Sequence, residues 1–225
     1  MHDHVVWQHA QKELSRQFQV TVLDFPGFGE SEHDPSIKDL NDYAHFLTKV
    51  TRELSLKDCT ILGHSFGGAV AIKTLALSKD LPVNKLILTD SSGIRRLHPK
   101  KIIGLFLAKS GKVAFSLPGL RRFRNPARRF LYNTIKETDY LDSGPLKQTF
   151  VRVVNDNIEG LLDKINNKTL IIWGQNDNIT PMSEAKIINT KIKNSKVTVI
   201  NNGTHFPFLE KPDEFCKIVT DFINE

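Results

Sequence analysis

Short runs of aliphatic and β-branched residues alternate with longer helical patterns along most of this chain. The runs that predict buried strands are residues 19–24, 60–62, 86–88, 169–173 and 197–200. Consecutive strands that are separated by helices pair in parallel through right-handed crossovers. The alternation therefore constrains the chain to the α/β class, with a mostly parallel sheet and helices on both faces.

The helical patterns have recognisable faces and ends. The first has an inner stripe of Trp7, Ala10, Leu14 and Phe18. Another begins at Leu40, where apolar residues recur every three or four positions, and Ser36 is the predicted cap at its start. A mostly apolar helix is expected over 69–77. Thr180 and Pro181 resemble the N-cap and first residue of a further helix, and the last helix begins at Pro212.

Residues 94–160 interrupt the alternation and predict an insertion in the form of a basic, mainly helical cap. The core is then formed by residues 1–93 and 161–225. No acidic residue lies between Asp90 and Glu137, whereas twelve lysines and arginines do, so this stretch carries +12 and the rest of the chain −6. A solvated surface, attraction of an acidic acyl substrate, and peripheral docking on an anionic membrane would each explain the charge. No nucleic-acid recognition motif accompanies it.

Composition excludes several classes of protein. Hydrophobic residues make up 40% of the 225 positions and charged residues 25%, as in soluble globular proteins. No apolar stretch approaches the roughly 18 residues of a membrane span, and the start lacks a secretory signal, so the expected location is cytoplasmic. Cys59 and Cys216 are expected to be free thiols. The cluster at residues 2–4, His-Asp-His, has no partner motif, and neither a metal nor a cofactor is expected.

The segment 63–68, Gly-His-Ser-Phe-Gly-Gly, lies between a predicted strand and a predicted helix. In that context Gly-x-Ser-x-Gly is typical of a nucleophile elbow, in which Ser65 is presented on a sharp turn. Glycine on both sides of the serine is expected to relieve steric clashes in the turn. The backbone N–H of Phe66 would then lie at a helix N-terminus, where it can stabilise an oxyanion.

A serine nucleophile needs a base and an acid, and both follow in the expected order. Asp177 comes after the strand at 169–173, and His205 comes after the strand at 197–200. The order Ser, Asp, His is the one found in α/β hydrolases. Asp90, directly after the strand at 86–88, is an alternative to Asp177 as the acid.

Four segments resemble the α/β-hydrolase superfamily: residues 24–31, 63–68, 173–177 and 203–212. The resemblance covers the chain except for the insertion. It implies Ser65 as nucleophile, Asp177 as the acid that orients the base, His205 as general base and Phe66 N–H as an oxyanion donor. Serine in the elbow disfavours the branches of the superfamily that use an aspartate nucleophile.

The chain departs from the family pattern at its start, where the initial strands and a His-Gly loop with a second oxyanion donor are absent. In the family order, the last of these strands lies between the segments 20–24 and 60–64. We expect either a truncated form of a longer enzyme, which we favour, or a rearranged sheet. Loss of one oxyanion donor would lower turnover by about 10²- to 10³-fold.

The expected activity is cofactor-independent hydrolysis of an ester in a small acyl substrate, through an acyl-enzyme. Amide, thioester or carbon–carbon cleavage, or acyl transfer, would use the same residues. The alternative hypothesis is a non-catalytic relative that binds a partner or an anionic membrane through its basic cap.

Overall fold

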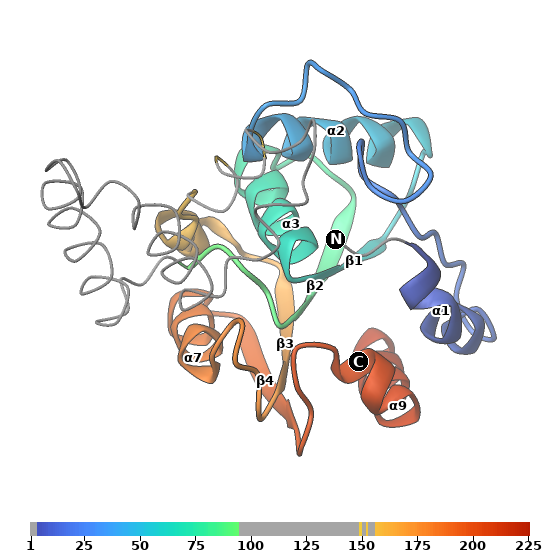
Figure 1. Ribbon diagram of the computed structural model, residues 1–225, viewed down its shortest axis with the longest axis vertical. Coiled ribbons are helices and arrows are strands. Elements are labelled where there is room, and N and C mark those ends of the chain that lie inside the picture. The colour runs from blue at the N-terminus through green and yellow to red at the C-terminus, as the bar shows by residue number, and fades with distance from the viewer. Residues whose placement is uncertain (1–3, 95–148, 150–151, 153–155) are drawn as a thin grey trace, which may run out of the picture. The chain divides into compact units, whose positions relative to one another are not determined.

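Four parallel strands form one sheet in the part of the chain that the structure describes (Figure 1). The structure is a computed structural model, and it describes residues 4–94, 149, 152 and 156–225. The strands lie in chain order and are β1 (Cys59–His64), β2 (Val83–Thr89), β3 (Lys168–Gly174) and β4 (Ser195–Ile200). Helix α3 (Phe66–Leu77) connects β1 to β2, and α7 (Met182–Lys191) connects β3 to β4. The predicted α/β class and the four later strands are confirmed.

Helices cover both faces of this sheet, because successive side chains of each strand point to opposite sides. Leu86 and Leu88 pack with α2 (Leu40–Glu53), α3 and α7, together with the short helix η5 (Glu159–Lys164). Ile87, between them, packs on the other face with α1 (Gln8–Leu14) and α9 (Pro212–Asn224). Two short elements complete this second face, η1 (His4–Trp7) and α8 (Pro207–Glu210). Figure 1 shows α1 and α9 on one side of the sheet and α3 on the other.

Helix α2 begins where the periodicity predicts, but a different residue caps it. The Asp39 carboxylate accepts hydrogen bonds from the backbone N–H groups of Asn41 and Asp42, and the Asp42 carboxylate accepts one from Asp39 N–H. This reciprocal arrangement satisfies N–H groups that the first turn leaves without helical partners. The prediction of Ser36 as the cap was wrong because Asp39, directly before the helix, is nearer to those groups.

The predicted strand at residues 19–24 is absent from the described sheet. A strand is stabilised by hydrogen bonds to a neighbour as well as by its own β-branched residues. No described strand pairs with this segment, and β1 is the edge strand on that side of the described sheet. Instead, Asp24 accepts hydrogen bonds from the backbone N–H groups of His4 and Glu30 and contacts the His4 ring. Side-chain contacts therefore hold the end of this segment.

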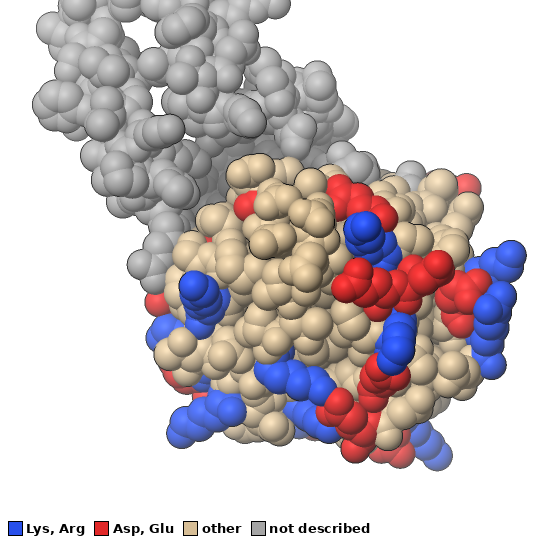
Figure 2. Space-filling model, turned by 90° about the horizontal axis from the view of Figure 1, so that it is seen from below, with Lys and Arg blue, Asp and Glu red and all other residues tan. Residues whose placement is uncertain are grey.

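The basic cap predicted over 94–160 falls almost wholly outside the described residues. Apart from Thr149, the described residues belong to one compact unit, which comprises 1–94 and 152–225. On the face seen in Figure 2, acidic and basic side chains are interspersed around other residues.

Within the described part, no helix has both the length and the apolar character to cross a bilayer.

Candidate active site

The predicted site residues follow the carboxyl ends of neighbouring strands. Ser65 comes directly after β1, Asp90 directly after β2, Asp177 three residues after β3 and His205 five residues after β4. Because all four strands are parallel, these ends lie along one edge of the sheet, where ligands bind in open α/β proteins.

Ser65 lies in the turn between β1 and α3 with a left-handed backbone, at φ 47° and ψ −116°. A positive φ is costly for a residue with a side chain and persists only where the surroundings enforce it. Here Ser65 N–H donates to the Thr89 carbonyl at 3.1 Å, and the Ser65 carbonyl accepts from Ser92 N–H at 3.0 Å. Both bonds join the turn to the end of β2, so the neighbouring strand holds the strained conformation.

The glycines around Ser65 do not all serve the purpose expected of them. A Cβ on Gly63 would lie 2.6 Å from the Gly67 carbonyl oxygen, so glycine is required there. A Cβ on Gly67 would meet no described atom within 4 Å, whereas one on Gly68 would lie 2.3 Å from the Ser91 hydroxyl. The expectation that Gly67 relieves a clash was wrong. The tight approach is at Gly68, where α3 packs on the residues that follow β2.

Phe66 is the first residue of α3, and among the described residues its backbone N–H has no acceptor. Its side chain is held by aromatic neighbours: it stacks on Phe28 with ring centroids 5.4 Å apart and meets Tyr43 and Phe25 edge-on at 5.0 and 5.7 Å. An N–H at a helix N-terminus attracts developing negative charge. The aromatic contacts therefore hold the residue whose backbone N–H is the predicted oxyanion donor.

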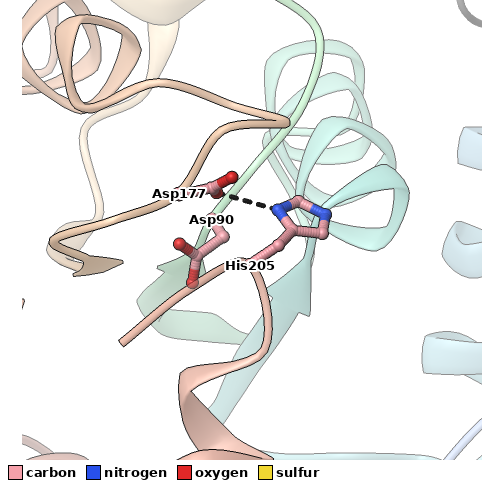
Figure 3. A group of neighbouring side chains, drawn as sticks. All are labelled: Asp90, Asp177 and His205. Atoms are coloured by element: carbon pink, nitrogen blue, oxygen red, sulfur yellow. Dashed lines mark hydrogen bonds and ion pairs between the residues drawn. The ribbon is translucent and has the colours of Figure 1, made fainter. Parts of the chain in front are cut away.

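Asp177 and His205, which are 28 residues apart in the chain, meet in a buried hydrogen bond. His205 Nδ1 and Asp177 Oδ2 are 2.8 Å apart, and the two residues are only 5% and 6% exposed (Figure 3). Asp177 Oδ1 also accepts from the N–H groups of Ile179 and Thr180 at 2.7 and 3.0 Å. Burial opposes ionisation of this carboxyl, but the hydrogen bonds from His205 and Thr180 outweigh burial and lower its pKa. The pair can thus orient the imidazole through Nδ1, which leaves Nε2 outside this hydrogen bond.

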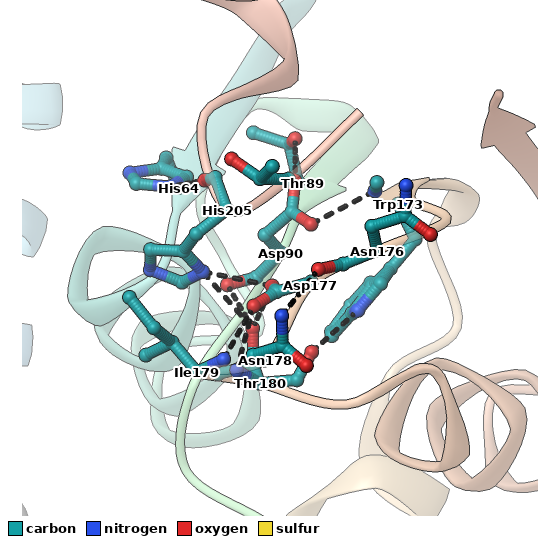
Figure 4. A network of polar contacts seen from close by, with 12 residues as sticks. His64, Thr89, Asp90, Trp173, Asn176, Asp177, Asn178, Ile179, Thr180 and His205 are labelled. Carbon is teal, nitrogen blue, oxygen red and sulfur yellow. Dashed lines mark hydrogen bonds and ion pairs between the residues drawn. The ribbon is translucent and has the colours of Figure 1, made fainter. Parts of the chain in front are cut away.

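Thr180 was predicted to cap the next helix, but it serves Asp177 instead. Its hydroxyl lies 2.6 Å from Asp177 Oδ2, 3.2 Å from His205 Nδ1 and 3.2 Å from the Asp90 carbonyl (Figure 4). Pro181 is the residue that precedes α7, which begins at Met182. Sequence periodicity gave no sign of this role, because the contact depends on how the loop after β3 turns back toward His205.

His64, directly before Ser65, is a further site residue that sequence reasoning missed. Its Nε2 lies 2.8 Å from the His205 carbonyl oxygen, and the two rings are 4.8 Å apart between centroids. This contact brings the end of β1 against the loop that carries His205. No hydrogen bond joins the Ser65 hydroxyl to His205 in the described part of the chain.

Asp90, the alternative acid, is also brought to this site. It is fully buried, and atoms of Asp90, Asp177 and His205 lie within 4.8 Å of one another, a spacing at which three ligands could hold a metal ion. Gly174 N–H and the Thr89 hydroxyl already donate to the Asp90 carboxyl, and the Thr180 hydroxyl donates to that of Asp177. These donors present positive ends where a cation would sit, so the arrangement fits a hydrogen-bond network better than a metal centre.

Comparison with known proteins relates the chain to one large family. Residues 2–212 match the model of the α/β-hydrolase fold family. A pimeloyl-[acyl-carrier protein] methyl ester esterase from Nitrosospira multiformis is 25% identical over 96% of this chain and 89% of its own length. A 2-hydroxy-6-oxononadienedioate/2-hydroxy-6-oxononatrienedioate hydrolase from Pseudomonas putida is 27% identical over 92% of this chain and 77% of its own. An esterase structure from Exiguobacterium antarcticum superposes with a TM-score of 0.77 at 21% identity, covering 100% of this chain and 88% of its own.

Proposed function

We propose, from the premise that this chain belongs to the α/β-hydrolase family, that it is a serine hydrolase which cleaves carboxylic esters through an acyl-enzyme. Its relatives are named as esterases and hydrolases, which supports hydrolytic activity in general. The observation that carries the finer proposal is the buried hydrogen bond between Asp177 and His205, at the same sheet edge as the strained turn at Ser65.

In the proposed reaction, His205 acts as the general base. Asp177 holds Nδ1 of the ring, so Nε2 is the atom that accepts the proton as the Ser65 O–H bond breaks. Ser65 Oγ then bonds to the carbonyl carbon of the ester, and the carbonyl oxygen becomes an oxyanion. Phe66 N–H stabilises that oxyanion as one donor.

The second half of the reaction returns the residues to their starting state. The oxyanion collapses, the bond to the alcohol breaks, and His205 gives its proton to the departing oxygen. His205 next accepts a proton from water as the water attacks the acyl-enzyme, and it returns that proton to Ser65 when the acid is released. The proton balance closes without a cofactor in this scheme.

Approach of Ser65 to His205 is the step that the proposal requires. The described structure has no hydrogen bond between them, and such bonds are often long before substrate binds. The contact of His64 with the His205 carbonyl keeps the residue adjacent to Ser65 beside the histidine loop. Because the two residues are already held near each other, a change of the Ser65 or His205 side-chain rotamer would bring them together without any rearrangement of the sheet.

A fluorophosphonate probe tests the proposal, because such probes phosphonylate activated serines. We expect labelling of the full chain at Ser65, with the site identified by peptide mass spectrometry, and loss of labelling in Ser65→Ala. Ser36→Ala, a matched change on an exposed loop, should label like the unchanged protein. A folded preparation that reacts with neither probe nor p-nitrophenyl esters of any acyl length would contradict the proposal and favour a binding role.

A further inference from the structure

Asp90 is a buried acid for which the proposed reaction has no use. It follows β2 directly, its φ is +44°, and none of its surface is exposed. Its carboxyl lies within 4.8 Å of titratable atoms of both Asp177 and His205. Ionisation of both carboxyls is strongly disfavoured when they are this close and this buried, because each opposes the charge of the other.

The hydrogen-bond donors around the two carboxyls decide which of them carries the charge. Asp177 receives four: two backbone N–H groups on Oδ1, and the Thr180 hydroxyl and the His205 ring on Oδ2. Asp90 receives two, from Gly174 N–H and from the Thr89 hydroxyl, each at 2.9 Å. One of the donors to Asp177 can itself become a cation, whereas both donors to Asp90 are neutral.

No lysine or arginine of the described residues compensates for a charge on Asp90. Among the described residues, it forms no ion pair with a lysine or an arginine, and the titratable groups found around it are Asp177 and His205. Burial and the nearby Asp177 carboxylate both raise the pKa of Asp90, against the lowering effect of its two donors. Asp90 thus has fewer hydrogen-bond donors than Asp177 and no lysine or arginine partner among the described residues, and both facts favour its protonated form.

We propose that Asp90 is a positioning residue that keeps its proton at neutral pH, so that Asp177 holds the single negative charge of the pair. The proposal rests on the proposed function for its catalytic meaning, because Asp177 is the acid assigned to orient His205. Asp90 acts on that acid through the backbone: its carboxyl accepts from Gly174 N–H at the end of β3, and its own carbonyl oxygen lies 3.2 Å from the Thr180 hydroxyl oxygen, whose proton goes to Asp177.

A neutral Asp90 also sets the charge that His205 meets during the reaction. A single carboxylate beside Nδ1 stabilises the imidazolium that forms when Ser65 loses its proton. If Asp90 were a second buried anion, it would make His205 hold that proton more tightly and would oppose its delivery to the leaving group. The expected benefit of the protonated acid is therefore a base that both accepts and releases its proton.

Carbon-13 NMR of the unchanged chain with labelled aspartate measures the proton directly. We expect one side-chain carboxyl resonance to remain in its protonated position at neutral pH, while the other aspartates are already carboxylates. That resonance should disappear in Asp90→Asn. If every aspartate resonance has moved to the carboxylate position by neutral pH, the proposal is wrong, and this result requires no active enzyme.

The pH dependence of stability gives a second measurement. An acid whose pKa is raised in the folded state loses stability as pH rises above its ordinary value of 3.8, because the unfolded chain then releases a proton that the folded chain keeps. The Asp90→Asn variant has no titrating group at this position, so it does not lose stability for this reason. The ratio of unfolding constants, wild type over variant, should therefore grow by up to about tenfold per pH unit until Asp90 ionises in the folded protein.

A matched variant separates this effect from a merely structural one. Asp221→Asn, at an exposed carboxyl that pairs with Lys217, should show no such growth with pH. A pH-independent offset for Asp90→Asn would mean that the residue acts through packing alone, and would overturn the proposal. The NMR and stability measurements do not depend on Ser65. A failure of the unchanged protein to react with the fluorophosphonate would therefore count against the proposed function and not against the protonation of Asp90.

Discussion

Replacing Gly174 by alanine tests how tightly the end of β3 is packed against the histidine loop. A Cβ at this position would lie 1.9 Å from the Thr204 carbonyl oxygen and 2.8 Å from that of Gly203, both of them backbone atoms. Ordinary contact begins at 3.4 Å, so the strand end and the loop must separate by about 1.5 Å. Thr204 directly precedes His205, and the movement would therefore displace the proposed base.

A displacement of about 1 Å at reacting groups costs on the order of 10²-fold in rate. We therefore expect Gly174→Ala to lower kcat by about 10²-fold or more with a smaller change in KM, together with about 1–3 kcal/mol of lost stability from overpacking. The assay is steady-state hydrolysis of a p-nitrophenyl ester, with circular dichroism to show that the variant is folded.

Gly160→Ala is the matched control, because a Cβ there meets no described atom within 4 Å. It should leave both kcat and the unfolding midpoint nearly unchanged. If Gly174→Ala retains the kcat of the unchanged protein, either the loop moves without consequence or His205 is not the base. Hydrogen exchange at residues 203–205 would then distinguish the two.

Three further predictions concern single carboxyl groups. Asp177→Asn should lower kcat by about 10⁴-fold, since an amide favours the wrong imidazole tautomer, and the exposed change Asp221→Asn should not; equal rates for the two variants would exclude Asp177 as the acid. Asp39→Ala removes the cap of α2 and should cost about 1 kcal/mol in denaturant unfolding, and an unchanged midpoint would refute the capping role. Burial opposes ionisation of Asp24, but hydrogen bonds from His4 and Glu30 outweigh it and lower its pKa, so its contribution to stability is present above the ordinary value of 3.8 and lost as pH falls. Asp24→Asn should flatten this acid limb, and a variant with the same acid limb as the unchanged protein would contradict the assignment.

The sequence predicted much of the sheet and where its site residues lie, because these depend on local patterns. Ser65, Asp177 and His205 each follow a run that reads as a buried strand, and parallel strands place such residues at one edge. The sequence favoured Asp177 as the acid, with Asp90 as the alternative, since both follow strands. Only the donors that surround each carboxyl in three dimensions separate them.

The errors arose where a residue's role depends on a distant partner. Residues 19–24 have the composition of a strand, but strand formation also needs a neighbour, which local sequence does not supply. Thr180 has the side chain and position of a helix cap, yet its hydroxyl contacts Asp177 because of the path of the loop. At the elbow, the spacing around Ser65 did not reveal that Gly68, rather than Gly67, approaches Ser91.

The parallel pairing of the sheet has a consequence for how errors in folding would affect catalysis. Ile171 and Ile172 are both fully buried, one on each face of the sheet, so a slip of one residue would only exchange one apolar side chain for another, and burial alone would not prevent it. Each residue of slip would carry a strand end about 3.3 Å along its axis. The residues that follow neighbouring strands would then no longer meet, so a misregistered molecule should be inactive even though its core is apolar.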